Sequence, residues 1–131
     1  MAKATMGPVS TITHKRTYRA EGGGLTRGYG VIAGTADDQV KAATPAAARC
    51  VGVVSETTAN AGDATNVVLF GETIAIAGAA IARGDRVKVM DGGKWEPGNA
   101  ADVETGGVAL SAAAADGDEF VMLVSPIHKR S

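Results

Sequence analysis

Hydrophobic and polar positions in residues 49–97 follow the patterns of β-strands. Cys50–Val54 is an apolar run of strand length, and Asn66–Ala77 is a longer run rich in β-branched residues. In Arg86–Val89 the valines alternate with the cations, which places each pair on its own face of a strand. We therefore predict a small meander-like β-domain, with a bend or bulge at Gly71 in the longest strand.

Shorter segments on either side extend this β-pattern. Tyr29–Ala33 opens the predicted body, Gln39–Ala43 is a short strand, and Glu119–Val124 is a last buried strand. The alanines at 112–115 favour a helix locally, but about 12 residues are needed for even marginal helicity. We therefore interpret residues 112–115 as part of a strand and turn.

Two segments share one pattern of residues. A strand that starts near Gly52 and another that starts near Gly107 are each followed by Gly-Asp ten residues later, and then by an apolar strand. These turns are Gly62-Asp63 and Gly117-Asp118, and Gly84-Asp85 is a third. Glycine allows a positive φ, and aspartate can accept hydrogen bonds from nearby backbone groups. The pattern predicts two similar hairpins in one barrel or sandwich, unless Gly-Asp is simply a common turn pair.

The chain divides into three regions by composition. Residues 1–28 form a predicted extended N-terminal arm with a flexible elbow at Gly22-Gly23-Gly24. Residues 29–125 form the predicted β-domain, and residues 126–131 form a short tail. A length of 131 residues suits a single domain of this kind.

The apolar residues are mostly small. Hydrophobic residues make up 45% of the chain, but only two Phe, two Tyr and one Trp are present. Alanine and valine bury little area, and each Å² of apolar surface removed from water contributes roughly 25 cal/mol. So thin a core indicates a fold that is completed by copies of itself or by a larger partner. No apolar segment approaches the roughly 20 residues of a membrane span, and we expect a soluble protein made in a reducing cytoplasm.

The net charge of −1 conceals an asymmetry along the chain. Residues 1–30 contain five basic residues against Glu21 alone, whereas the remainder contains 8 basic and 13 acidic residues. A basic leader on an acidic body indicates binding either to nucleic acid or to an acidic protein surface. Because no aromatic series is interleaved with these cations, we do not expect nucleic acid as the partner.

Catalytic and cofactor motifs are missing from the sequence. Cys50 is the only cysteine and has apolar neighbours, and the only histidines are His14 and His128. Neither metal-ligand spacing nor a pair of carboxylates placed for acid–base chemistry is visible. Gly22–Gly28 is rich in glycine but lacks the Lys-Ser/Thr of a phosphate-binding loop. We expect no cofactor, no metal and no enzymatic activity.

Two further motifs have a structural and a functional interpretation. Arg83-Gly84-Asp85 spells a cell-adhesion tripeptide, but it stands where a turn is expected, and we interpret it as that turn. Trp95 is either a core residue or an exposed contact, since large aromatic side chains often anchor interfaces.

Glycine and valine patterns recur in Ala48–Val54, Gly62–Ala64 with Val67–Gly71, Ala79–Asp85 with Val87–Val89, and Gly107–Leu110 with Gly117-Asp118. Through these residues, the segment Val31–Val124 resembles the small capsid decoration, or cement, proteins of tailed bacteriophages. The resemblance implies a compact β-barrel or β-tulip with an N-terminal arm. It also implies attachment to the outer surface of an expanded capsid in the virion, with the major capsid protein as partner. A homotrimer is expected, with a dimer as the alternative.

Two sets of site residues follow from this hypothesis. The arm is expected to bind acidic or strand-edge surface of the shell and so to bridge its subunits, through Lys15, Arg16, Tyr18, Arg19, Arg27 and Tyr29. Self-association is expected to bury an apolar surface formed by Phe70, Ile74, Ile76 and Trp95.

The main alternative is a carbohydrate-binding or β-clip-type accessory domain, which the segment Ala79–Val89 suggests. Sugar sites usually contain exposed aromatic residues, of which this chain has few. An enzyme has no supporting constellation of residues. A nucleic-acid-binding module would show binding that weakens steeply with salt.

Overall fold

The computed structural model describes residues 13–46, 48–98 and 104–127, where every regular element is a β-strand. All nine strands belong to one sheet, in the order β1-β3-β2-β4-β5-β9-β8-β6-β7. The predicted all-β class is confirmed. The strands are β1 (His14–Ala20), β2 (Gly30–Ala33), β3 (Gln39–Ala42), β4 (Gly52–Val54), β5 (Ala64–Ile76), β6 (Arg86–Val89), β7 (Trp95–Pro97), β8 (Thr105–Ala109) and β9 (Glu119–Ile127).

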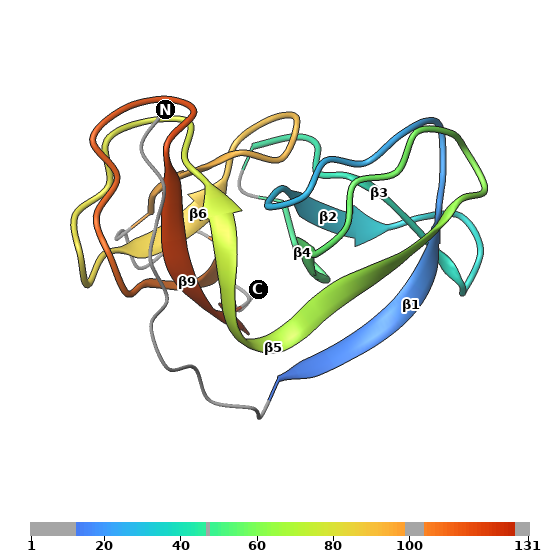
Figure 1. Cartoon of the computed structure of the whole chain (residues 1–131), viewed down its shortest axis with the longest axis horizontal. Helices are drawn as coiled ribbons and strands as arrows, with labels where there is room; N and C mark the ends of the chain where they lie inside the picture. The colour runs from blue at the N-terminus through green and yellow to red at the C-terminus, as the bar shows by residue number, and fades with distance from the viewer. Residues whose placement is uncertain (1–12, 47, 99–103, 128–131) are drawn as a thin grey trace.

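The first half of the molecule is a closed five-stranded barrel. An additional antiparallel pairing between β1 and β5 joins the two ends of the series β1-β3-β2-β4-β5. In the β1–β5 pairing, His14 lies opposite Phe70 and Arg19 lies opposite Ala64. Figure 1 shows β1 running beside the first part of β5. The barrel interior holds a cluster of buried side chains that are mostly valine and alanine: Tyr18, Ala20, Leu25, Val31, Val40, Val54 and Val67.

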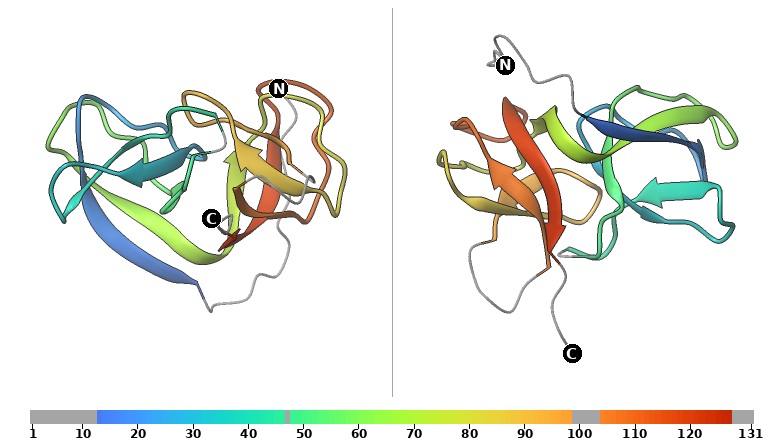
Figure 2. Two further views of the ribbon diagram at one scale, coloured as in Figure 1. Left: turned by 180° about the vertical axis from the view of Figure 1, so that it is seen from behind. Right: turned by 90° about the horizontal axis from the view of Figure 1, so that it is seen from below.

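The second half is built on the remainder of β5. At Gly71, whose φ of 119° favours glycine, β5 leaves β1 and pairs with β9, where Gly71 lies opposite Val124. The sheet continues through β8 and β6 to β7, which returns to the end of β5. There Trp95 forms a bridge with Ala77, and the Gly78 N–H donates to the Trp95 carbonyl at 2.7 Å. Figure 2 shows the two halves side by side, with β5 passing through both.

Trp95 is the largest buried side chain of the described residues and joins the two halves. Its side chain has 0% exposure, and its indole N–H donates to the Gly28 carbonyl of the first half at 3.2 Å. Gly106 makes room for the ring, because a Cβ at this position would collide with the indole. A Cβ on Gly30 would likewise stand 2.8 Å from the ring. Trp95 therefore requires glycine on both of its flanks.

The repeated Gly-Asp pairs form one type of turn, as the sequence predicts. Gly62, Gly84 and Gly117 have φ values of 88°, 91° and 89°. In each turn the aspartate that follows accepts a hydrogen bond from the backbone N–H three residues before it: Ala82 for Asp85, Asn60 for Asp63, and Ala115 for Asp118. The turn at Gly62-Asp63 closes the antiparallel pair β4–β5, and the turn at Gly117-Asp118 closes the antiparallel pair β8–β9. The two predicted hairpins are therefore present.

The same turns also hold the sheet together across long stretches of sequence. The Ala20 N–H donates to the Asp63 carbonyl at 2.9 Å, and the Ala77 N–H donates to the Asp118 carbonyl at 2.8 Å. The Ala109 N–H donates to Asp85 in the same way, at 2.8 Å. Each turn thus accepts a backbone hydrogen bond from a buried alanine that is distant in the sequence.

The predicted arm is wrong for residues 13–28. β1 belongs to the barrel, and Tyr18, Ala20 and Leu25 are buried in its core. Because β1 pairs with β5, Tyr18 is only 9% exposed, whereas a tyrosine in a free arm would be exposed to solvent. The predicted division at residue 28 therefore does not separate an arm from the body, and residues 1–12 lie outside the described part of the chain.

The glycine-rich elbow is also tied to the body. The Leu25 N–H donates to the Thr58 hydroxyl at 2.9 Å, next to the three glycines. Before them, the Glu21 carboxylate accepts from the Thr35 N–H at 2.8 Å, and this hydrogen bond lowers the pKa of Glu21. At the other end, β9 extends to Ile127 and takes in two residues of the predicted tail, of which 128–131 are not described.

Replacing Trp95 should test how far the two halves depend on each other. We expect Trp95→Ala to lower the free energy of unfolding by about 3–5 kcal/mol, because the indole leaves a large cavity. Trp95→Phe keeps most of the volume and loses the hydrogen bond to Gly28, so its loss should be smaller. Urea unfolding of the purified chain measures both. A loss below about 1 kcal/mol for Trp95→Ala would contradict this role.

The Gly-Asp turns can be tested at Asp63, whose carboxylate accepts from the N–H groups of Ala59 and Asn60. Asp63→Ala removes both acceptors and should cost about 1–2 kcal/mol of stability. Asp63→Asn keeps an acceptor oxygen in the same place and should cost less. The same urea titration distinguishes them, and equal losses for the two variants would show that the hydrogen bonds are unimportant.

Candidate functional site

The described residues contain no group of His, Cys, Asp and Glu side chains that could hold a metal ion. Cys50 is buried, and burial raises the pKa of its thiol to about 12, so the reactive thiolate is disfavoured. In Arg83-Gly84-Asp85 the carboxylate of the aspartate bonds the Ala82 N–H within the turn, as expected for a structural turn.

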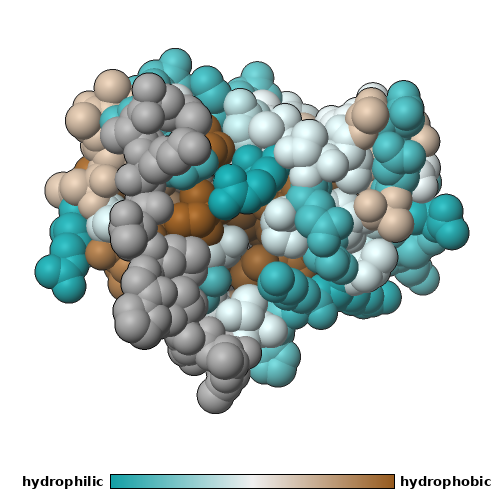
Figure 3. Space-filling model, in the orientation of Figure 1, coloured by the Kyte–Doolittle hydropathy of each residue, from teal (hydrophilic) through white to brown (hydrophobic). Residues whose placement is uncertain are grey.

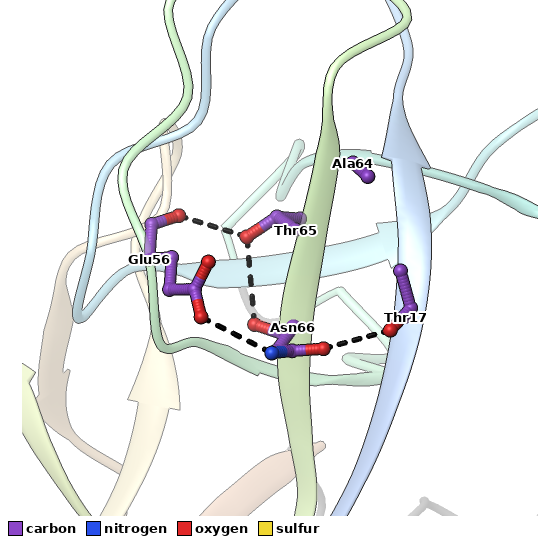
Figure 4. Close-up of a pocket in the computed structure, with 5 residues that line it drawn as sticks. All are labelled: Thr17, Glu56, Ala64, Thr65 and Asn66. Carbon is purple, nitrogen blue, oxygen red and sulfur yellow. Dashed lines mark hydrogen bonds between the residues drawn. The ribbon is translucent and has the colours of Figure 1, made fainter.

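A small pocket lies on the outside of the barrel where β1 meets β5 (Figure 4). Its side chains bond one another: Thr17 donates to the Asn66 side-chain oxygen at 2.8 Å, and the Asn66 amide donates to Glu56 at 3.1 Å. The Thr65 hydroxyl donates to the Glu56 carbonyl at 2.8 Å. Because these groups satisfy each other, the pocket serves mainly to fix β1 on β5.

Four of the six residues predicted to bind the capsid lie on β1. Lys15, Arg16 and Arg19 are exposed, whereas Tyr18 is buried and cannot present its ring to a partner. The Arg16 guanidinium lies 5.0 Å from the centre of the Tyr18 ring, so Tyr18 positions this cation. Arg19 pairs with Asp38 at 3.4 Å on the open surface, where such a pair adds little stability.

The other two predicted residues, Arg27 and Tyr29, lie in the loop that leads to β2. Arg27 pairs with Glu119 of β9 at 3.4 Å, and Tyr29 is half-buried. The structure therefore does not gather the six residues into one site. Of these cations, Lys15 and Arg16 have no carboxylate partner among the residues that the structure describes.

The predicted oligomer-interface residues differ sharply in exposure. Phe70 is 49% exposed, and among the described residues it is the one large hydrophobic side chain that is exposed. The His14 ring approaches it edge-on, with the two ring centres 6.5 Å apart. Ile74 and Ile76 are half-buried, on the face of β5 opposite the buried Ala75. The prediction that Trp95 belongs to the oligomer interface is wrong. Trp95 is a core residue and has no exposed surface.

Figure 3 shows a hydrophobic area within an otherwise mostly hydrophilic face. In Figure 1 the same part of the molecule contains β5 and β9. Ile74 of β5 lies opposite Val121 of β9, and Ile74 and Leu123 are half-buried, whereas Val121 is buried. Ile76 is less accessible, because a Cβ on Gly28 would stand only 2.7 Å from it.

Sequence reasoning missed the partners that position this surface. Asp38 and Glu119 neutralise two of the predicted binding cations, and Asn66 fixes Thr17 in the middle of β1. These contacts join residues 19 to 92 positions apart, and local sequence patterns carry no signal for them. The only available hint was the acidic excess outside the first 30 residues.

Comparisons with known proteins place the chain among phage proteins. The family model described as "Phage cement protein" matches residues 9–125. The chain is similar in structure to the head fiber gp8.5 N base of bacteriophage phi29, with a TM-score of 0.69 and 20% sequence identity. That match covers 92% of this chain and 99% of the phi29 chain. Curated proteins give no match.

Within the described ranges, no helix is long and apolar enough to cross a bilayer. The family match covers β1 to β8 in full and β9 as far as residue 125. At 20% identity the phi29 structure supports the fold alone. The chain belongs to the phage cement protein family and is a capsid-associated structural protein.

Proposed function

We propose that this protein binds the outer surface of an expanded phage capsid and stabilises it by bridging subunits of the major capsid protein. Membership of the cement family supports binding to the capsid. The observation that carries the proposal is that Lys15 and Arg16 are exposed and have no carboxylate partner among the described residues, on the strand whose His14 lies opposite the exposed Phe70. The protein is made in the host cytoplasm and acts without catalysis, since a clamp needs only binding energy.

Bridging is the simplest way in which a bound protein without catalytic activity can stabilise a shell. A shell under internal pressure opens where its subunits separate, and a rigid body bound to two subunits resists that separation. When one body is bound at two places, the second contact forms at a high effective concentration. The barrel and its fused second half provide such a rigid body, because β5 runs without interruption from one to the other.

Self-association through the outward face of β5 completes the proposal. A homotrimer, with a dimer as the alternative, would bury Phe70 and Ile74, with Ile76 at the margin. Burial of exposed apolar area stabilises such contacts by roughly 25 cal/mol per Å². Trp95 has no part in this interface, because its own core encloses it.

The central experiment uses expanded capsids assembled without this chain. Purified protein is added, and the number of bound copies and the temperature at which the particles open are measured. We expect saturable binding and a higher opening temperature. Binding that leaves the opening temperature unchanged would contradict stabilisation, and no binding would contradict the proposed function.

The cationic contact is tested by reversing one charge on β1. Lys15→Glu should weaken binding to these capsids by about tenfold, because one opposite-charge contact becomes a like-charge contact. Arg83→Glu changes the net charge equally on an exposed turn of the other half and should bind like the natural protein. Equal losses for the two variants would indicate a general charge effect and no specific role for β1.

The self-association surface is tested at its most exposed residue. Phe70→Asp should reduce the fraction of oligomers bound on capsids, measured by chemical cross-linking of the particles, by several-fold. Phe70→Leu, which keeps an apolar side chain, is the matched control. Unchanged cross-linked oligomers with Phe70→Asp would exclude this face of β5 from the interface.

A further inference from the structure

β1 is paired on both sides for only part of its length. Along one edge, Lys15 to Arg19 lie opposite Val68 to Ala64 of β5. Along the other edge, β3 pairs with β1 at Arg19 and Ala20. Within the part of the chain that the structure describes, Lys15 to Tyr18 therefore have a strand partner on one side only, and Figure 1 shows β1 at the margin of the molecule.

The hydrogen bonds at the end of β1 show which backbone groups point to the open edge. The Arg19 N–H donates to the Asp38 carbonyl at 2.7 Å, on the side of β3, whereas the Ala20 N–H donates to Asp63, on the side of β5. Backbone groups of successive residues in a strand point to opposite edges. The N–H and C=O groups of Lys15 and Thr17 therefore point, like those of Arg19, away from β5.

An open edge of this kind is a template for another strand. The last strand of the sheet, β7, is less suitable, since it has three residues and ends in Pro97. β1 offers two N–H donors and two C=O acceptors in regular spacing and contains no proline. Thr17 is held by its bond to Asn66, so the edge is already extended before a partner arrives.

The charge of the edge selects the partner. Lys15 and Arg16 are exposed and, among the described residues, have no carboxylate partner. The Arg16 guanidinium lies over the Tyr18 ring, which positions it. Pairing of β1 with β1 of a second copy would bring these cations together, which disfavours self-pairing. An extended segment that carries Asp or Glu fits both the backbone and the charges.

We propose that the open edge of β1, from Lys15 to Tyr18, binds an extended acidic segment of the capsid protein by strand addition. This inference rests on the proposed function, because the shell supplies the segment. The backbone groups of Lys15 and Thr17 bond the added strand, and carboxylates of that strand pair with Lys15 and Arg16. The main-chain hydrogen bonds would fix one register between the two strands, which attraction between charged surfaces alone would not do.

The test compares Thr17→Pro with Thr17→Ala on expanded capsids assembled without this chain. Both variants lose the hydroxyl bond to Asn66, but only proline removes the outward N–H and places its ring where the added strand would lie. The backbone hydrogen bonds of Arg16 and Tyr18 to β5 remain, so the melting temperature of Thr17→Pro should be close to that of Thr17→Ala. We expect Thr17→Pro to bind at least about tenfold more weakly than Thr17→Ala.

Each other outcome has a definite meaning. Equal binding of folded Thr17→Pro and Thr17→Ala would overturn strand addition while leaving capsid binding intact. Loss of self-association by Thr17→Pro without capsids would assign the edge to a second copy and would also overturn it. If the natural protein does not bind the capsids at all, the proposed function fails, and this inference fails with it.

Hydrogen exchange of the natural protein provides a test that does not depend on the folding of a variant. In the free protein the amides of Lys15 and Thr17 should exchange quickly, whereas those of Arg16 and Tyr18 should be protected by β5. On the capsids, exchange at Lys15 and Thr17 should slow by about tenfold or more, because each amide would then donate a backbone hydrogen bond to the added strand. Unchanged exchange at these two amides on saturated capsids would refute the proposal.

Discussion

The burial of one indole ring decides how the two halves of this protein fit together. Trp95 belongs to β7 of the second half, yet its N–H donates to Gly28 of the first half, 67 positions away. The ring lies against Gly30 and Gly106, where any side chain would collide with it. Because most other core residues are alanine and valine, no other side chain of the described core can supply the same area. The path of β5 through both halves depends on this contact.

The strands and their turns could be predicted from the sequence because they depend on neighbouring residues. Alternation in Arg86–Val89 and the Gly-Asp pairs before β5 and β9 act within a few positions. The order of strands depends on residues that are far apart, such as His14 opposite Phe70. A local pattern cannot reveal that pairing. The meander prediction was therefore wrong in topology, since β5 lies next to β9 and the barrel closes through β1.

The candidate site was predictable in part for the same reason. The cationic character of residues 14–27 was visible in the sequence, but the identity of the free cations was not. Arg19 and Arg27 meet Asp38 and Glu119 only after folding. Trp95 shows the limit most clearly, because a lone tryptophan among polar residues fits a core and an interface equally well until its neighbours are known. Burial is a property of the fold, and one sequence does not contain it.

The incorporation of β1 into the barrel changes the energetics of the proposed contact. A free arm would lose roughly 1–2 kcal/mol of backbone entropy for each residue that it orders on the shell. β1 is ordered in advance by β5, by the Thr17–Asn66 bond and by the stacking of Arg16 on Tyr18. Under the proposed function, only the segment of the shell protein must become ordered, so the contact costs less conformational entropy than binding by a free arm would. A strand that is already part of the barrel therefore needs fewer contacts with the shell than a free arm to reach the same affinity.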